Sequence, residues 1–144
     1  MKVYPDANLY ITFLLGQRGE EAANRFFRQG ISCRFSIVAS NTMFAEVAQR
    51  CGRSGIILLQ KNIDDFKKAG KLEVHEVDKD ETDEAVRMNL ASGRRFGLND
   101  MEHAIIARKC ADIFVTDDKK LALYLRKTSG QEVALLSEFV DSEP

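Results

Sequence analysis

Short apolar segments alternate along the chain with longer segments in which apolar residues recur every three to four positions. The first pattern is typical of buried strands and the second of amphipathic helices. Strands are predicted at Lys2–Tyr4, Arg34–Val38, Leu72–Val77, Ile113–Thr116 and Glu132–Leu136. Helices are predicted at Ala7–Leu15 and Glu20–Gln29, from a cap among Ser40, Asn41 and Thr42 to Arg50, from a Ser54 cap to Gly70, from Asp80 to about Arg95, from Asn99 or Asp100 to about Ala111, and at Lys119–Arg126. This alternation predicts a three-layer α/β/α fold with a mainly parallel central sheet.

The spacing of apolar residues also predicts which helix faces are buried. Val86 and Leu90 are expected to point inward, and Gly30 and Gly52 are expected to end their helices. A stripe is formed by Ile56, Leu59, Ile63 and Phe66. Ile57 and Leu58 lie beside this stripe, which makes the apolar arc broader than a monomer's surface needs. We therefore expect a homodimer that uses this helix or the Ala7–Leu15 helix.

The composition is that of a globular protein. The chain has 144 residues, 44% of them hydrophobic and 30% charged, with a net charge of -1. This size predicts one domain over residues 1–144. The charge balance excludes a strongly basic nucleic-acid coat but permits a local basic patch.

Neither a membrane anchor nor a disulfide framework is expected. No apolar run approaches the roughly 18–20 residues of a membrane helix, and the first residues lack the apolar core of a signal peptide. The cysteines Cys33, Cys51 and Cys110 are odd in number and scattered. We interpret them as small buried hydrophobic residues of a cytoplasmic protein.

Acidic residues follow two predicted strands, at the edge where parallel sheets bind their ligands. Asp6 follows the first strand, and Asp117 and Asp118 follow the strand Ile113–Thr116. Asp100 opens a later helix, where a carboxylate can serve as a helix cap. Its helical face continues through His103 and three alanines, so Asp100 ends a buried stripe. A buried carboxylate must be paired, protonated or bound to a metal.

Glu46 is a fourth candidate, on a helix flank with Met43 and Arg50. Periodicity alone leaves its side chain in solvent, the usual state of a helix glutamate. If four carboxylates converged, they would repel one another unless a divalent cation neutralised them. Oxygen ligands suit Mg²⁺ or Mn²⁺, and one or two such ions can activate a water and stabilise a phosphodiester transition state. The chain has 22 acidic residues, so this grouping alone does not fix a function.

The order of these motifs is more specific than any one of them. A strand leads to Asp6-Ala7-Asn8, and Ser40 leads into the helix that carries Glu46. Then follow Gly97-Leu98-Asn99-Asp100-Met101-Glu102-His103-Ala104 and Val115-Thr116-Asp117-Asp118. Over nearly its whole length the chain resembles a PIN domain, the nuclease fold of VapC toxins in VapBC toxin–antitoxin pairs.

This resemblance implies an activity and a set of residues. The family's four acidic positions fall on Asp6, Glu46, Asp100 and Asp118. The implied function is an Mg²⁺- or Mn²⁺-dependent endoribonuclease that cleaves single-stranded RNA, in which these four residues are both the catalytic residues and the metal ligands. It also implies a protein antitoxin as partner and frequent homodimers.

Several residues keep two interpretations. Pro5 before Asp6 departs from the family pattern, and Asp117 competes with Asp118 as the fourth acid. Thr116 can orient a ligand carboxylate or serve as an ordinary strand residue. Asn8 can orient Asp6 or merely begin its helix, and His103 is interpreted as a packed residue below Asp100. Basic side chains near the motifs can contact phosphates or remain solvated: Arg50, Arg53, Arg94, Arg95, Lys119 and Lys120.

Three other functions compete with a toxin nuclease. An RNA-processing PIN nuclease would need no antitoxin. A non-catalytic RNA- or protein-binding module on the same fold would have no need of a repulsive acid cluster. A phosphotransfer receiver domain carries paired acids after its first strand, whereas here only Asp6 stands at that place.

Overall fold

The structure is a computed structural model that describes residues 1–32 and 34–142. Its strands are β1 (Lys2–Pro5), β2 (Ser36–Ser40), β3 (Leu72–His75), β4 (Ile113–Thr116) and β5 (Val133–Leu135). Its helices are α1 (Ala7–Leu15), α2 (Glu20–Ile31), α3 (Asn41–Lys68), α4 (Lys79–Ala91), α5 (Leu98–Cys110), α6 (Lys119–Thr128) and α7 (Leu136–Asp141).

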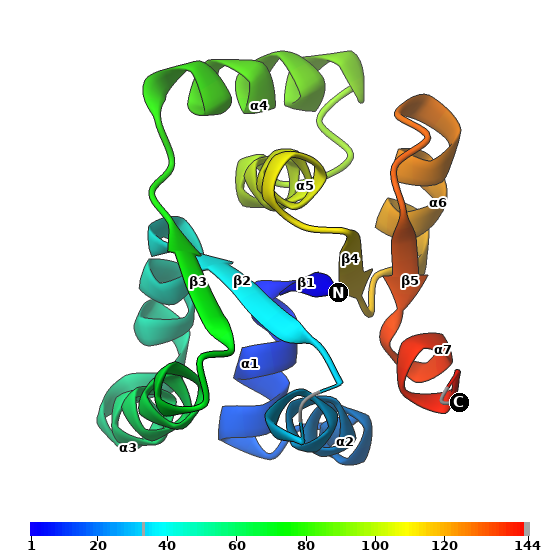
Figure 1. Cartoon of the computed structure of the whole chain (residues 1–144). Helices are drawn as coiled ribbons and strands as arrows, with labels where there is room; N and C mark the ends of the chain where they lie inside the picture. The colour runs from blue at the N-terminus through cyan, green and yellow to red at the C-terminus, as the bar shows by residue number, and fades with distance from the viewer. Residues whose placement is uncertain (33, 143–144) are drawn as a thin grey trace.

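The strands form one parallel sheet in the order β3-β2-β1-β4-β5 (Figure 1). β1 is the central strand, and its register with β4 pairs Tyr4 with Phe114 and Pro5 with Val115. All strands run the same way, so their carboxyl ends meet at one edge. Asp6 and the residues after β4 therefore share that edge.

Helices cover both faces of the sheet, which confirms the predicted three-layer α/β/α fold. Figure 1 shows α1, α2 and α3 on one face and α5 on the other, with α4 stacked outside α5. The middle of the sheet is fully buried, with Val3, Tyr4, Ile37 and Val115 all 0% exposed. A central strand buried on both faces is expected in such a fold.

Most element boundaries follow local signals in the sequence. Asp6 is the N-cap of α1, and Gly16 ends that helix in the left-handed conformation, at φ 63°. Ser40 is the N-cap of α3, where its hydroxyl accepts a hydrogen bond from the Met43 amide. Gly52 (φ 65°, ψ -171°) has a non-helical conformation and divides α3 into two helical halves at a kink, as predicted. The predicted helix end at Gly30 differs from expectation.

Gly30 lies inside α2 and does not end it. A Cβ atom at this position would lie 2.9 Å from the Phe66 ring and 3.0 Å from the Phe35 ring. The glycine therefore permits α2 to approach these two aromatic residues closely. Its signal in the sequence is the same as that of a helix stop, which explains the wrong prediction.

The inward face of α4 was also predicted wrongly. Val86 is 41% exposed and Leu90 54% exposed, whereas Glu81 and Ala85 are buried. α4 packs mainly on α5 and lies outside the layer that covers the sheet (Figure 1). A polar network at Glu81 orients it, so the apolar side chains of the opposite face remain in solvent. The short helix α7 was not predicted.

Two of the three cysteines lie in the described part of the chain. Cys51 is buried and Cys110 is half-buried, both as free thiols. The prediction for Cys33 falls outside the described residues. Among the described helices, none combines the length and the apolarity needed to cross a membrane.

Candidate functional site

Asp6 is held at the carboxyl end of β1 by its neighbour strand. Its backbone amide donates to the Val115 carbonyl at 2.8 Å, which extends the β1–β4 pairing by one residue. Its side chain is buried, with the residue 2% exposed. The Thr116 hydroxyl donates to Asp6 Oδ2 at 2.8 Å. Of the two interpretations of Thr116, the structure thus confirms that it orients a carboxylate.

Thr116 also links Asp6 to Asp118. The Asp118 amide donates to the Thr116 hydroxyl oxygen at 3.1 Å, and Asp118 Oδ1 accepts from the Leu121 amide at 3.0 Å. Asp118 is therefore the N-cap of α6, and it is exposed. One threonine hydroxyl fixes both acids that follow β1 and β4.

Asp100 approaches from the start of α5. It is the third residue of the helix, and its Oδ2 accepts a hydrogen bond from the Gly97 amide at 3.1 Å. Asp100 therefore helps to cap α5 through its side chain, as the capping interpretation expected, but the N-cap residue is Gly97. A carboxylate has about four lone-pair sites, so this single bond leaves acceptor capacity on Asp100.

The charges of these acids act on one another's pKa values. Burial raises the pKa of Asp100, and the charges of Asp6 and Asp118 raise it further. Burial also raises the pKa of Asp6, with a smaller contribution from the Glu46 charge. Each of the four predicted site residues therefore influences, or is influenced by, another of the four. These interactions link Asp6 to Glu46 and to Asp100, and Asp100 to Asp118.

Glu46 points into the molecule, contrary to its solvated alternative. Its Oε2 lies 2.9 Å from His103 Nε2, and its side chain is 22% exposed. The other ring nitrogen, Nδ1, lies 2.8 Å from the Tyr4 hydroxyl, which lies 2.8 Å from the Ser40 hydroxyl. A buried polar chain thus runs from Glu46 through His103 and Tyr4 to Ser40.

His103 is packed, as expected, but its environment is strongly acidic. Burial by itself lowers the pKa of His103. The hydrogen bond to Glu46 and the charges of Asp6, Glu46 and Asp100 outweigh burial, and the net pKa is raised. The charge of His103 in turn lowers the pKa of Asp6 and of Asp100. An imidazolium among the carboxylates would offset part of their mutual repulsion.

Comparison with known proteins identifies the fold. No protein-family model matches the chain, and no curated protein matches its sequence. A chain in the crystal structure of VapBC2 from Rickettsia felis bound to a DNA fragment from their promoter matches with a TM-score of 0.62 and 14% identity, over 94% of this chain and 98% of that chain. PAE2754 from Pyrobaculum aerophilum matches with a TM-score of 0.56 and 18% identity, over 98% of this chain and 96% of that chain.

VapBC2 is a toxin–antitoxin complex whose VapC component is a PIN-domain nuclease, and PAE2754 is a PIN-domain protein. This chain has the PIN-domain fold. The structural likeness confirms the fold that the sequence motifs predicted. At these identities it says nothing about individual site residues, so the roles of the four acids remain predictions.

Asp117 and Asp118 have different surroundings in this PIN fold. The charge of Asp118 contributes to the raised pKa of Asp100, whereas burial of its own carboxyl group raises the pKa of Asp117. Asp117 points toward the turn before α2, where its Oδ2 would lie 3.8 Å from a Cβ atom at Gly19. These observations favour Asp118 as the fourth acid.

The donor set suits a divalent cation in its chemistry. Asp6, Asp100 and Asp118 offer only oxygen atoms, the ligands that Mg²⁺ and Mn²⁺ prefer. Among the described residues, 1–32 and 34–142, no three acidic, histidine or cysteine side chains are arranged so that they could hold a metal ion. Asp118 and Asp100 each use one oxygen on a backbone amide.

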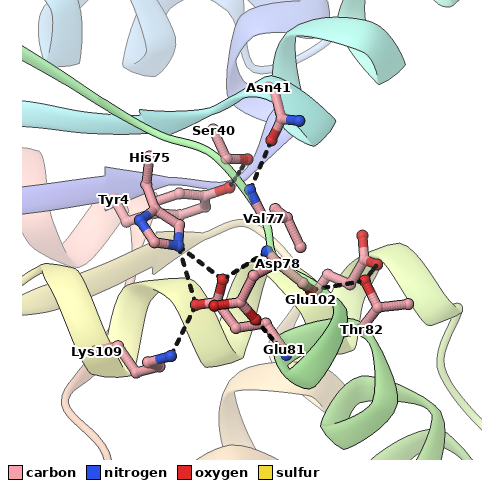
Figure 2. Close-up of polar contacts among 10 residues, drawn as sticks. All are labelled: Tyr4, Ser40, Asn41, His75, Val77, Asp78, Glu81, Thr82, Glu102 and Lys109. Carbon is pink, nitrogen blue, oxygen red and sulfur yellow. Dashed lines mark hydrogen bonds and ion pairs between the residues drawn. The ribbon is translucent and has the colours of Figure 1, made fainter.

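A second polar cluster, shown in Figure 2, joins β3, α4 and α5. His75 Nε2 and Lys109 Nζ lie 2.8 Å and 3.0 Å from the Glu81 carboxylate, which is 2% exposed. Glu81 also closes a capping box with Asp78. These bonds outweigh burial and lower the pKa of Glu81 to about 2. The Asp-x-x-Glu spacing was the available sequence signal for this cluster. It joins α4 to β3 and α5, and its His75 pairs with Ser40 in the β2–β3 register.

Proposed function

We propose that this protein is a metal-dependent endoribonuclease that cleaves single-stranded RNA. The observation that carries the proposal is the placement of Asp6 and Asp118 at the carboxyl edge of a PIN fold, linked through the Thr116 hydroxyl. Burial, together with the charges of Asp6 and Asp118, raises the pKa of Asp100, and acids with raised pKa values are candidates for functional sites.

Asp6, Glu46 and Asp100 would hold the main cation, and Asp118 would complete the site or hold a second ion. When bound, the cation supplies a Lewis acid that activates water and stabilises the leaving oxygen of a phosphodiester. Thr116 fixes the orientation of Asp6, and His103 fixes that of Glu46. Because these supports are buried, the acids need little reorganisation to take up the cation.

We also propose that the protein is the toxin of a toxin–antitoxin pair in the cytoplasm. The likeness to a chain of VapBC2 supports an antitoxin partner. We call the carboxyl edge of the sheet with Asp6, Asp100 and Asp118 the acidic edge. The antitoxin would be a protein that blocks this acidic edge. Co-expression with a small neighbouring reading frame that encodes a DNA-binding protein should relieve growth arrest caused by this chain alone.

A homodimer through α3 is part of the proposal. Ile56, Ile57 and Leu58 are 45%, 66% and 49% exposed, so three consecutive apolar side chains lie in solvent. Ile56 was expected to be buried with Leu59, and its exposure widens this patch. The alternative helix, α1, has most of its apolar residues buried. Sedimentation at tens of micromolar should show a dimer, and Ile57→Lys should yield a monomer.

A cleavage assay tests the proposed activity. Purified protein is incubated with end-labelled single-stranded RNA in Mg²⁺ or Mn²⁺, with duplex RNA and single-stranded DNA as controls. We expect cleavage of the single-stranded RNA alone, its loss in EDTA and its return with added metal. A protein that binds the RNA without cleaving it under any of these conditions would be a binding module on the same fold.

A further inference from the structure

A pocket of about 410 Å³ lies between α6 and the connection from α4 to α5. We call it the aromatic pocket, and it is lined by Arg95, Phe96, Lys120, Leu123, Tyr124 and Lys127. The lining residues of α6 recur at i, i+3, i+4 and i+7, which places them on one helical face. The opposite face of α6, with Leu121 and Leu125, is buried in the core.

At the centre of the aromatic pocket, two aromatic rings and a guanidinium group lie close together, with the ring planes tilted by 44°. The Phe96 and Tyr124 rings lie 5.2 Å apart, and the Arg95 guanidinium lies 5.7 Å and 5.1 Å from their centres. Leu123 adds an apolar wall and is 61% exposed. Aromatic rings and guanidinium planes are the surfaces on which nucleic-acid bases stack.

Two side-chain hydrogen bonds support the backbone around these groups. Gly93 and Arg94 both adopt the left-handed region, at φ 70° and φ 60°. The Asn89 side-chain amide donates to the Phe96 carbonyl, and Arg95 Nε donates to the Ser92 carbonyl at 3.2 Å. A prearranged loop loses little conformational entropy when a ligand binds.

The charges of the aromatic pocket select the class of ligand. Arg95, Lys120 and Lys127 are exposed cations, and among the described residues no acidic side chain lines the pocket. Such a surface attracts a polyanion with planar groups. It repels the basic side chains that a protein would use to cover the acidic edge. RNA therefore fits better than a protein segment.

The aromatic pocket adjoins the acids through the chain itself. Lys120 comes two residues after Asp118, and Phe96 comes four residues before Asp100. Asp100 and Asp118 are themselves close enough to interact electrostatically. A nucleotide seated in the pocket would thus be next to a phosphodiester at the acids.

We propose that the aromatic pocket binds a nucleobase of single-stranded RNA, with Lys120 and Lys127 on the neighbouring phosphates. This inference rests on the proposed function and names a substrate-binding site for it. The pocket would hold the strand beside the acids and contribute to binding rather than to the chemical step.

RNA binding without cleavage provides the test. The Asp100→Asn protein in EDTA is titrated into a short fluorescein-labelled single-stranded RNA of mixed sequence, and anisotropy is measured. In this background, Tyr124→Leu should weaken binding about 5- to 150-fold, the range for loss of one stacked base. Tyr124→Phe keeps the ring and should bind like its parent. Lys120→Gln and Lys127→Gln should each reduce the slope of log K against log salt by about 0.7.

Phe13→Leu is the matched control, since Phe13 is a half-buried aromatic residue that lines a different cavity. It should not change binding. Unchanged binding by Tyr124→Leu overturns the proposal and leaves the pocket to a protein partner. If Tyr124→Leu binds normally and the wild type still cleaves RNA, the pocket proposal is rejected and the proposed nuclease function stands. Binding that depends on Tyr124, in a protein that never cleaves RNA, supports the pocket and rejects the nuclease.

Discussion

His103 Nε2 lies 2.9 Å from Glu46 Oε2, and this contact joins α5 to α3 behind the acidic edge. The histidine is fully buried and has a raised pKa because acids surround it. It can therefore hold Glu46 in place and supply positive charge where a cation is absent. His103 is a positioning residue in this view, since it acts through Glu46.

The first prediction concerns this contact. His103→Gln should lower RNA cleavage about 10- to 100-fold, the usual cost of losing a residue that orients a metal ligand. The loss should include a higher Mg²⁺ concentration for half-maximal activity, which a purely structural defect would not produce. Tyr4→Phe removes only the hydroxyl that holds the other ring nitrogen, and it should cause a smaller change in the same direction. An unchanged Mg²⁺ dependence in both variants would contradict a positioning role.

The second prediction distinguishes Asp118 from Asp117. Asp118→Asn should impair cleavage far more than Asp117→Asn, because only Asp118 is bonded to Thr116 and influences Asp100. Asparagine can still accept the Leu121 amide, so the cap of α6 is retained and stability should change little. Equal or reversed losses would assign the fourth position to Asp117.

The third prediction concerns stability without metal. The folded-state pKa values of Asp6 and Asp100 are raised, so the apo protein should gain stability as pH falls through these values toward about 4. The raised pKa of His103 has the same sign: its stabilising effect is complete below about 6.5 and is lost as pH rises through the folded value. Asp100→Asn should raise the apo melting temperature, measured by calorimetry at pH 8.

Added metal should raise the melting temperature of the wild type, and this rise should require Asp100. A cation that binds only the folded wild type adds roughly 2.7 kcal/mol at a hundredfold excess over its Kd, which is several degrees in melting temperature. Asp100→Asn should lose this response. If the variant melts below the apo wild type, the bond from Asp100 to the Gly97 amide matters more for stability than the charge repulsion does.

The fourth prediction concerns Glu81, which serves as a structural counterpart to the site. Its pKa is lowered to about 2, so its stabilising effect is present above about 4.5 and is lost as pH falls toward 2. Glu81→Gln should lower the free energy of unfolding at pH 7 by on the order of 2–3 kcal/mol. The difference from wild type should shrink between pH 5 and 2, as followed by urea unfolding. RNA cleavage by the folded variant should be retained.

The sequence predicts which acids follow the strands, but it does not predict the buried contacts behind them. Asp6 and Asp118 follow apolar strands, and parallel strands bring such residues together wherever they lie in the chain. The contact between Glu46 and His103 could not be predicted this way. It joins two helices on opposite faces of the sheet, and its formation depends on how far each side chain reaches past the strand ends.

The errors in the fold have a common cause. Val86 and Leu90 face solvent because the buried charges at Glu81 decide how α4 docks. Gly30 lies inside α2, which ends at Ile31, because the Phe35 and Phe66 rings occupy the space that a side chain at this position would need. In both cases a tertiary contact overrides a local signal, and periodicity contains no information on such contacts.

Cleavage of single-stranded RNA by wild type and Asp100→Asn, with Asp83→Asn as control, tests the metal mechanism most directly. Asp83 is an exposed acid of α4, so its variant makes the same charge change away from the site. Wild type and Asp83→Asn should cleave in Mg²⁺ or Mn²⁺ and stop in EDTA, while Asp100→Asn should lose at least about 100-fold. Cleavage that persists in EDTA, or full activity in Asp100→Asn, would contradict a metal site built on these acids.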